Sequence, residues 1–259
     1  MSAELSRMKV KELQDECRRL GLRATGKKAE MMERILEHRS KKRSVESKNG
    51  MNEQGKSKKM KVVNEDRWTR ELEKIFHNYE DLENAGFMSE DGILALCDHI
   101  GVDAQDPVML ALSLHMKAQS MSELSREEFI TGMKTLECHT IEQLKAKMPS
   151  LSKKYENDAS FFAHVYAFSY GFAKEKDQKS LGVETALALW ELLLVKRFPL
   201  LNDWVDYVKN HHKNAISKDV WTQTLEFTIH VKPDLSNYDE NSAWPVLIDD
   251  FVAHMKEKK

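Results

Sequence analysis

Apolar residues recur at helical spacing in two short segments near the start of the chain. The first stripe consists of Val10, Leu13, Cys17 and Leu20, and the second of Met31, Met32, Ile35 and Leu36. Gly21 ends the first segment, and Gly26 interrupts the connection between the two. Because neither stripe can be buried alone, we expect the two helices to pack against each other as a helical hairpin.

After Arg67 the apolar stripes follow one another almost continuously, and no strand-like alternation persists. The first two stripes contain Trp68, Leu72, Ile75, Phe76 and Tyr79, and then Ile93, Leu94, Leu96 and Cys97. Further stripes cover 107–117, 126–136, 158–173, 183–195, 200–210 and 219–229, and the last contains Trp244, Leu247, Ile248, Phe251, Val252 and Met255. The pattern predicts an all-α fold, with the hairpin followed by a multi-helix body.

Between these parts the periodicity disappears. We therefore divide the chain into a hairpin at 1–40, a basic disordered linker at 41–64 and a helical body at 65–259. The linker's basic clusters resemble a two-part nuclear import signal, although such runs also serve as plain tethers. On this basis we expect a nuclear protein, with the cytoplasm as a second location.

Composition favours helices and adds a division of charge. Among 259 residues only 10 are Gly and 5 are Pro, while 32% are charged and 41% hydrophobic. The net charge of −2 conceals 18 basic and 9 acidic residues in 1–63, against 22 and 33 in 64–259. A net charge of +9 in one part and −11 in the other indicates two kinds of partner.

Cysteine usage and the N-terminus limit the compartment. Cys17, Cys97 and Cys138 are scattered and odd in number, so we expect a reducing compartment without disulfides or a zinc site. No stretch approaches the roughly 18 apolar residues of a membrane span. The N-terminus has no apolar signal region, and Ser2 stands where myristoylation requires glycine. We expect no membrane partner.

Two connections in the first half of the body resemble EF-hand loops, which bind calcium through oxygen ligands and a bidentate Glu at the twelfth position. In the first loop, Asp81 and Glu83 are followed by Ala85 at the fifth position and Gly92 at the twelfth. In the second, Lys117, Gln119 and Met121 occupy the first, third and fifth positions, before Glu128 at the twelfth. We expect EF-hand-like helix pairs that bind no calcium.

The sequence offers no constellation for catalysis. His211 and His212 are adjacent, so they point to different sides of a helix, and no acid lies one turn away. Cys97 and Cys138 have apolar neighbours and read as core residues. No glycine-rich phosphate loop, HExxH motif or nucleophile elbow occurs. We predict neither enzymatic activity nor a cofactor.

The N-terminal hairpin resembles a SAP domain, a DNA-binding helix-extension-helix module. The resemblance covers residues 5–39 and rests on VKELQDECRRLGL and GKKAEMMERIL. It implies contacts with DNA phosphates from the basic residues Arg18, Arg19, Arg23, Lys27 and Lys28. Binding of this kind depends on counterion release, so it should weaken with salt and depend little on DNA sequence. The same residues also fit a solvated basic extension.

Residues 67–257 resemble the defective-in-cullin-neddylation family. The resemblance is carried, in order, by EDGILALCDHIGVD, EEFITGM, FAKEKDQKSLGVETALALW, ISKDVW and SNYDENSAWPVLIDDFV. It implies a non-catalytic, ligase-like scaffold that helps transfer the ubiquitin-like modifier NEDD8 from its conjugating enzyme to a lysine of a cullin. Such a scaffold acts by proximity and orientation, and the reactive cysteine belongs to the conjugating enzyme.

The resemblance places the surface for the cullin's C-terminal winged-helix region at Asp219, Ala243 and Asp249. The carboxylates can pair with Lys or Arg, and the small Ala243 permits close approach. Outside this motif, Asp219 would fit a helix N-terminus after Ser217, and Asp249 a solvated helix face.

The same resemblance implies an apolar groove for the acetylated N-terminal methionine of the conjugating enzyme. It falls on Ile93, Met109, Leu112, Met116, Leu124, Phe172, Leu189 and Leu192. Polar Ser113 and Ser122, and the flexible Met109 and Met116, replace bulkier or stiffer groups there, and Met adapts to irregular partners. Each of these apolar residues also fits an ordinary core position.

Two functions from different classes are open at this point. One is a cullin-neddylation scaffold delivered to the nucleus, and the other is a SAP-type chromatin- or DNA-binding protein whose helical body is an interaction module for other partners. The presence of Asp219 and Asp249 favours the first. A SAP-like hairpin indicates recruitment to chromatin rather than to a membrane.

Overall fold

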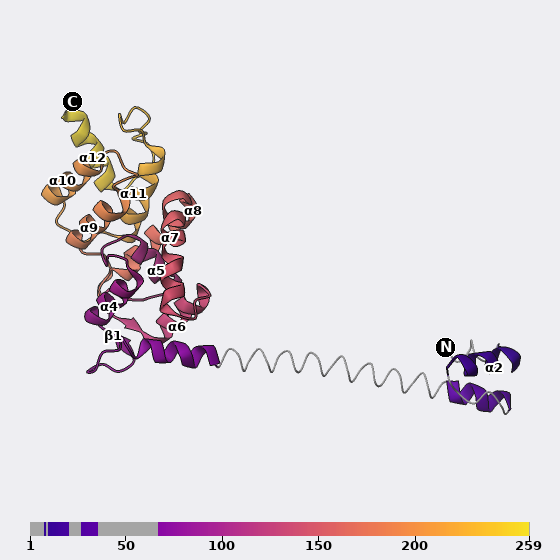
Figure 1. The fold of residues 1–259 in the computed structure, drawn as a ribbon. Helices are drawn as coiled ribbons and strands as arrows, with labels where there is room; N and C mark the ends of the chain where they lie inside the picture. Colours follow the sequence, from indigo (N-terminus) through magenta and orange to yellow (C-terminus); the bar gives the residue numbers. More distant parts are fainter. Residues whose placement is uncertain (1–7, 9, 21–26, 36–66, 259) are drawn as a thin grey trace. The chain divides into compact units, whose positions relative to one another are not determined.

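The computed structural model describes residue 8 and residues 10–20, 27–35 and 67–258 (Figure 1). They belong to two compact units, one within Met1–Arg67 and the other within Trp68–Lys259. The linker predicted at 41–64, together with Gly21, Gly26 and Leu36 of the predicted hairpin, lies outside the described residues.

The first unit contains two helical segments with a small shared core. Helix α2 spans Val10–Arg19, and a second segment is helical over 28–35. Leu13 and Cys17 of α2 are fully buried together with Met31 and Ile35 of the second segment, which confirms the predicted hairpin. Val10 departs from the predicted buried stripe: its side chain is 47% exposed and does not pack against the buried cluster, whereas Leu20 at the other end of the stripe does.

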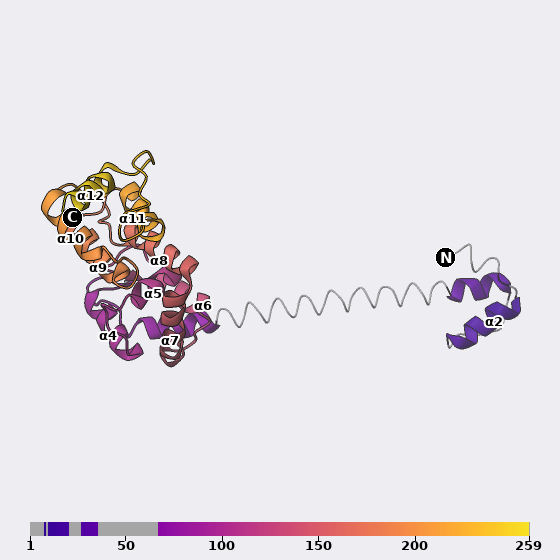
Figure 2. The ribbon, with the colours of Figure 1, turned by 90° about the horizontal axis from the view of Figure 1, so that it is seen from above.

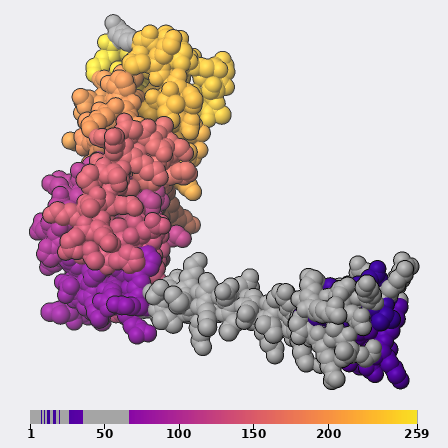
Figure 3. Space-filling view, turned by 45° about the vertical axis from the view of Figure 1, so that its right-hand side comes forward, coloured from indigo at the N-terminus to yellow at the C-terminus, as the bar shows by residue number. Residues whose placement is uncertain are grey.

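The second unit is all-α apart from two short strands, as the sequence predicts. After helical residues 67–76 it contains α4 (Glu90–Ile100), α5 (Val108–Met116), α6 (Arg126–Thr135), α7 (Ile141–Asn157), α8 (Ala159–Phe172), α9 (Val183–Leu194), α10 (Leu201–His211), α11 (Lys218–His230) and α12 (Val246–Glu257). Both ribbon views place α4 and α6 at one end of this unit and α10 to α12 at the other (Figures 1 and 2). The surface follows the same order, from purple to yellow (Figure 3).

Two EF-hand-like helix pairs form the first half of the body. Strand β1 (Phe87–Met88) pairs antiparallel with β2 (Leu124–Ser125), with Met88 opposite Leu124, and so joins the two interhelical loops. Gly86 begins this connection with φ +92°, a backbone conformation that favours glycine. The strand pair joins the residues directly before α4 to those directly before α6. Leu124 of β2 and residues of α4 contribute to the cavity described below.

Helix α7 is missing from the stripes that we derived from the sequence. Its buried side chains Leu144, Met148, Leu151 and Tyr155 recur at intervals of three and four residues, a signal that could have found it. The helix continues through Pro149, where a proline removes one backbone hydrogen bond. Helix α7 contacts α4, α5 and α8 and therefore connects the EF-hand-like half to the rest of the body.

An aromatic cluster holds the C-terminal half together. The Tyr166 ring stacks on Trp221 with centroids 4.4 Å apart, and Trp190 stacks on the same Trp221 at 5.5 Å. The Tyr166 hydroxyl donates to the Trp221 carbonyl oxygen at 2.8 Å and accepts from Trp190 Nε1 at 2.9 Å. Buried hydrogen bonds that are all satisfied make a core rigid, so α8, α9 and α11 form a fixed platform.

Gly92 in α4 is expected to be intolerant of any side chain. A Cβ atom at this position would lie 2.1 Å from the Tyr79 carbonyl oxygen, which belongs to the backbone and has little room to move. Gly92→Ala should therefore lower the free energy of unfolding by roughly 1–3 kcal/mol, measured by thermal denaturation. The control is Gly171→Ala in α8, where a Cβ would meet nothing within 4 Å. Equal melting temperatures for the two variants would contradict the expected clash between a side chain at position 92 and the Tyr79 carbonyl oxygen.

Candidate functional site

The eight apolar residues predicted for the conjugating-enzyme groove surround a single cavity of about 480 Å³. They come from α4 (Ile93), α5 (Met109, Leu112, Met116), β2 (Leu124), α8 (Phe172) and α9 (Leu189, Leu192). The fold thus brings together residues that are up to 99 positions apart in the sequence. Their role in binding the conjugating enzyme stays a prediction.

The lining of the cavity combines buried core residues with partly buried ones. Leu112 and Leu189 are buried, whereas Ile93, Met109 and Leu192 are only partly buried. The floor is therefore part of the packed interior, and the partly buried side chains are the ones that an inserted apolar group would touch. Both interpretations made from the sequence, a groove and a core, describe the same residues.

Sequence reasoning missed part of the cavity lining. Leu96 and Cys97 on α4 also line it, and Cys97 Sγ lies 4.0 Å from Met109 Sδ. Burial raises the pKa of the Cys97 thiol, which agrees with its assignment as a core residue. The spacing of Ile93, Leu96 and Cys97 on one helix face could have pointed to their shared position.

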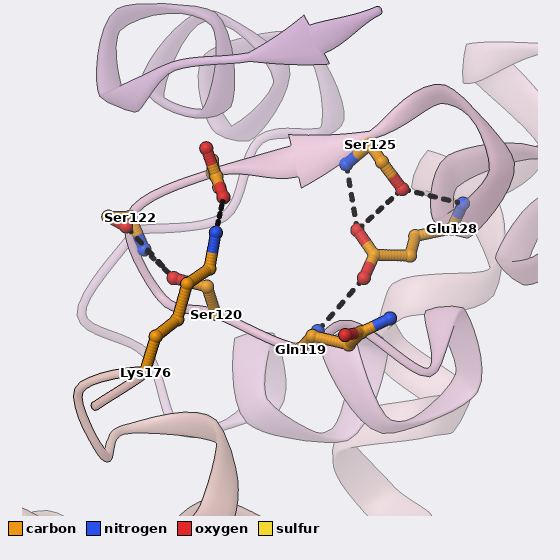
Figure 4. Close-up of polar contacts among 7 residues, drawn as sticks. Gln119, Ser120, Ser122, Ser125, Glu128 and Lys176 are labelled. Atoms are coloured by element: carbon orange, nitrogen blue, oxygen red, sulfur yellow. Dashed lines mark hydrogen bonds and ion pairs between the residues drawn. The ribbon is translucent and has the colours of Figure 1, made fainter. Parts of the chain in front are cut away.

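Of the two serines expected to reshape the groove, only Ser113 lines the cavity. The placement of Ser122 there is wrong: its side chain is exposed, and its hydroxyl lies 2.9 Å from that of Ser120 (Figure 4). Ser120 itself lines the cavity. The loop before β2 therefore turns Ser122 toward solvent, an orientation that a motif alignment does not reveal.

An ion pair joins two connections beside the cavity. Lys176 Nζ, in the connection between α8 and α9, lies 2.5 Å from Oε1 of Glu123, which lines the cavity. Figure 4 shows the lysine side chain extending to the loop that carries Ser120 and Ser122. Hydrogen bonding to Glu123, followed by the attraction of its charge, raises the pKa of Lys176. The pair links the connection between α8 and α9 to the loop that forms one edge of the cavity.

In the second EF-hand-like loop, the acid at the twelfth position is bonded to the chain itself. Glu128 Oε1 accepts the Gln119 backbone N–H at 3.0 Å, and Oε2 accepts the Ser125 backbone N–H at 2.7 Å (Figure 4). The Ser125 hydroxyl accepts the Glu128 N–H at 3.3 Å and completes a capping box at the start of α6. Both carboxylate oxygens of Glu128 therefore accept hydrogen bonds from the backbone of the loop.

The first loop is closed in a similar way. Asp81 Oδ1 accepts the backbone N–H groups of Glu83 and Asn84, at 2.7 and 3.1 Å, and these bonds lower the pKa of Asp81. Arg126 places its guanidinium 3.1 Å from Glu80 Oε1, so a cation already lies beside this loop. Within the part of the chain that the structure describes, no group of three or more His, Cys, Asp or Glu side chains could hold a metal ion.

Calcium is expected to leave the protein unchanged. Both loops use their carboxylates for internal hydrogen bonds, and Lys117 at the first ligand position would repel the ion. Calorimetric titration with calcium should give no binding heat, and the melting temperature should not shift. A micromolar binding site, or a rise in melting temperature with calcium, would contradict the prediction, because ligands of the native state stabilise it.

The three residues predicted for cullin binding lie on α11, α12 and the connection between them. Asp219 is exposed in the first turn of α11, where the Ser217 hydroxyl accepts the Val220 N–H at 3.1 Å. Ala243 is exposed in the connection, and Asp249 is partly buried in the first turn of α12. Helices α11 and α12 contact each other and lie at the same end of the unit (Figures 1 and 2). The binding role of the three residues stays a prediction.

The adjacent acids Asp249 and Asp250 lie on different sides of α12. Asp249 Oδ1 accepts a hydrogen bond from the Tyr238 hydroxyl of the preceding connection. Asp250 lies close enough to Tyr207 of α10 that, after burial, its charge is the second cause of the raised pKa of that tyrosine. The two carboxylates therefore present themselves to different neighbours, which makes Asp250 a control for Asp249.

The basic residues predicted to bind DNA are only partly described. Lys27 is exposed and Lys28 partly buried at the start of the second helical segment. Arg18 and Arg19 belong to α2, but their side chains, like the whole of Arg23, lie outside the described residues.

The cysteines and His211, which the sequence analysis considered for catalysis or metal binding, pack against other residues of the fold. Cys17, Cys97 and Cys138 are free, buried thiols. The ring of His211 stacks on Tyr207 with centroids 4.6 Å apart. Among the helices that the structure describes, none combines the length and apolar character needed to cross a membrane.

Comparison with known proteins gives two family matches. A model described as cullin binding matches residues 143–254, and a SAP domain model matches residues 4–40. Human DCN1-like protein 5 is 38% identical over 169 residues, which cover 65% of this chain and 71% of that protein. Human DCN1-like protein 4 is 36% identical over 184 residues, which cover 71% of this chain and 62% of that protein. The Drosophila melanogaster DCN1-like protein 4 is 34% identical over 181 residues, which cover 70% of this chain and 73% of that protein.

Proposed function

The chain belongs to the family of DCN1-like proteins, and from this membership we propose that it is a non-catalytic scaffold that binds a cullin and promotes its modification by NEDD8. The observation that carries the proposal is the cullin-binding match over 143–254, which includes Asp219, Ala243 and Asp249. An accessible alanine between two helices with acidic first turns suits a basic partner surface.

We assign the acetylated N-terminus of the NEDD8-conjugating enzyme to the 480 Å³ cavity. An acetylated methionine has no charged amino group, so it can enter an apolar pocket without the cost of burying an unpaired charge. The lining methionines Met109 and Met116 can adjust to such an unbranched side chain. The partly buried Ile93 and Leu192 are available for contact.

The scaffold mechanism needs two partners held by one rigid body. The cavity lies among α4, α5 and α9, whereas the cullin residues belong to α11, α12 and their connection. The Tyr166, Trp190 and Trp221 cluster joins α8, α9 and α11 and supports a fixed spacing between the two surfaces. Holding donor and acceptor together replaces a bimolecular encounter by an effectively unimolecular step.

The proposal is tested by direct binding of the full chain to the C-terminal regions of a panel of cullins. We expect saturable binding of at least one cullin, weakened by salt because charged groups take part. Failure to bind any of them, combined with retained DNA binding, would favour the other candidate, a chromatin-associated protein whose body serves different partners.

The SAP domain leads us to propose DNA binding and a nuclear place of action. Affinity for duplex DNA should fall steeply between low and physiological salt and vary little with sequence. Replacing both Lys27 and Lys28 by Ala should reduce the slope of log affinity against log salt by about 2. The control replaces the exposed Lys145 and Lys147 of α7. Equal slopes for the two double variants would assign the binding to another surface.

A further inference from the structure

The connection between α11 and α12 is held in one conformation by its own hydrogen bonds. The side chain of Asn237 donates to the His230 carbonyl oxygen and accepts the Lys232 N–H, both at 2.7 Å. Leu235 is buried although its φ is +61°, a conformation that non-glycine residues adopt only when their surroundings impose it. The backbone position of Tyr238, three residues later, is therefore fixed.

The partly buried Tyr238 ring has aromatic and cationic neighbours. It stacks on Trp244 with centroids 6.1 Å apart and packs edge-on against Phe227 of α11 at 6.1 Å. Lys256 Nζ lies 5.8 Å from the ring centroid and 2.6 Å from Glu240 Oε1. These contacts restrict the ring on several sides, so the position of its hydroxyl is determined by the core of the α11–α12 end.

The Tyr238 hydroxyl donates a hydrogen bond to Asp249 Oδ1. Burial, followed by the hydrogen bond to Asp249, raises the pKa of Tyr238, so the hydroxyl remains protonated and able to donate throughout the physiological range. A partly exposed aspartate otherwise samples several rotamers, and a hydrogen bond from a fixed donor removes that freedom. Oδ2 is then the oxygen left for an incoming cation.

We propose that Tyr238 is a positioning residue for cullin recognition, which fixes the Asp249 carboxylate in its binding orientation through Oδ1 and leaves Oδ2 for a lysine or arginine of the cullin. This inference rests on the proposed function, because it assumes that Asp249 contacts the cullin. It adds a residue that touches no partner itself. The gain comes from preorganisation, since the ordering cost of the aspartate is met when the protein folds.

The test is a double-mutant cycle on the full chain with Tyr238→Phe, Asp249→Ala and the double variant. Phenylalanine keeps the ring and its stacking but removes the donor. Tyr238→Phe should raise the Kd for the cullin C-terminal region about fivefold to tenfold, and less than about twofold when Asp249 is already Ala. In neddylation assays the KM for cullin should rise in proportion, with the rate at saturating cullin unchanged.

Tyr79→Phe is the matched control. It removes a hydroxyl that bonds His99 Nδ1 at 2.7 Å in the EF-hand-like half, far along the chain from the cullin residues. It should leave the Kd for cullin unchanged, and thermal denaturation of every variant verifies that each remains folded at the assay temperature.

The possible outcomes separate the inference from the proposed function. Equal weakening by Tyr238→Phe with and without Asp249 would mean that Tyr238 acts through the shape of the connection, and it would overturn the inference. If Tyr238→Phe binds cullin with unchanged affinity while Asp249→Ala binds it more weakly, the inference is also overturned, but the scaffold function stands. If Asp249→Ala and Ala243→Arg both bind cullin like the unmodified chain, the assignment of the cullin surface fails and the inference fails with it, although the chain still binds cullin. If the unmodified chain binds no cullin, the proposed function itself fails.

Discussion

Ala243→Arg is expected to abolish cullin binding while the protein stays folded. Ala243 is exposed in the connection before α12, so an arginine there displaces no core side chain. In a complex it would fill the space needed for close approach and place a cation against a basic partner. Such clashes cost several kcal/mol, and the Kd should rise on the order of a hundredfold or more.

The neighbouring acids provide a graded comparison in the same binding experiment. Asp249→Ala should weaken cullin binding by roughly 1–3 kcal/mol, the usual effect of losing a charged hydrogen bond at an interface. Asp250→Ala should have little effect, because that carboxylate lies on the Tyr207 side of α12. Isothermal titration of the three variants against one cullin should therefore rank Ala243→Arg first, Asp249→Ala second and Asp250→Ala last. A larger effect from Asp250 than from Asp249 would contradict the assignment of the surface.

Ala188→Arg is expected to weaken binding of the acetylated conjugating-enzyme N-terminus by one to two orders of magnitude, that is, roughly tenfold to hundredfold. Ala188 on α9 is exposed and also lines the cavity, so a long side chain there can obstruct the entrance without replacing a buried residue. Excluding a buried methionine side chain forfeits about 1.5–3 kcal/mol, which corresponds to roughly a tenfold to hundredfold loss of affinity. Binding of an acetylated N-terminal peptide, followed by fluorescence anisotropy, measures this loss.

The control for this variant is Ala159→Arg, the same substitution at an exposed position in the first turn of α8 that does not line the cavity. It should bind the peptide like the unmodified chain, and both variants should bind cullin normally. If Ala188→Arg binds the acetylated peptide with unchanged affinity, the peptide occupies another surface.

The helical organisation could be predicted because it depends on periodicity. Leu13, Cys17, Met31 and Ile35 are buried as their spacing indicates. Val10 fits the same stripe but is exposed, because helical spacing alone does not tell which members of a stripe meet the partner helix. Helix α7 was not predicted, although its buried residues have helical spacing. It contains Pro149, and a proline usually interrupts a helix.

The candidate site required both the resemblance and the structure. The eight groove residues come from five separate elements, and no local pattern in the sequence relates Ile93 to Leu192. The close approach of Gly92 to the Tyr79 carbonyl and the bond from Tyr238 to Asp249 also depend on three-dimensional packing. Composition and spacing contain no record of such contacts. The acidic character of the body, by contrast, was evident from the sequence and agrees with a basic partner.

The scaffold account is tested most directly by reconstituted neddylation. The conjugating enzyme is charged with NEDD8, mixed with a cullin C-terminal region, and the initial rate of transfer is measured with and without the full chain. The account predicts a faster transfer that saturates with added protein, is lost with Ala243→Arg and is retained with Asp250→Ala. A transfer rate that is the same without the protein, with it and with Ala243→Arg would contradict the claim that this chain promotes cullin modification.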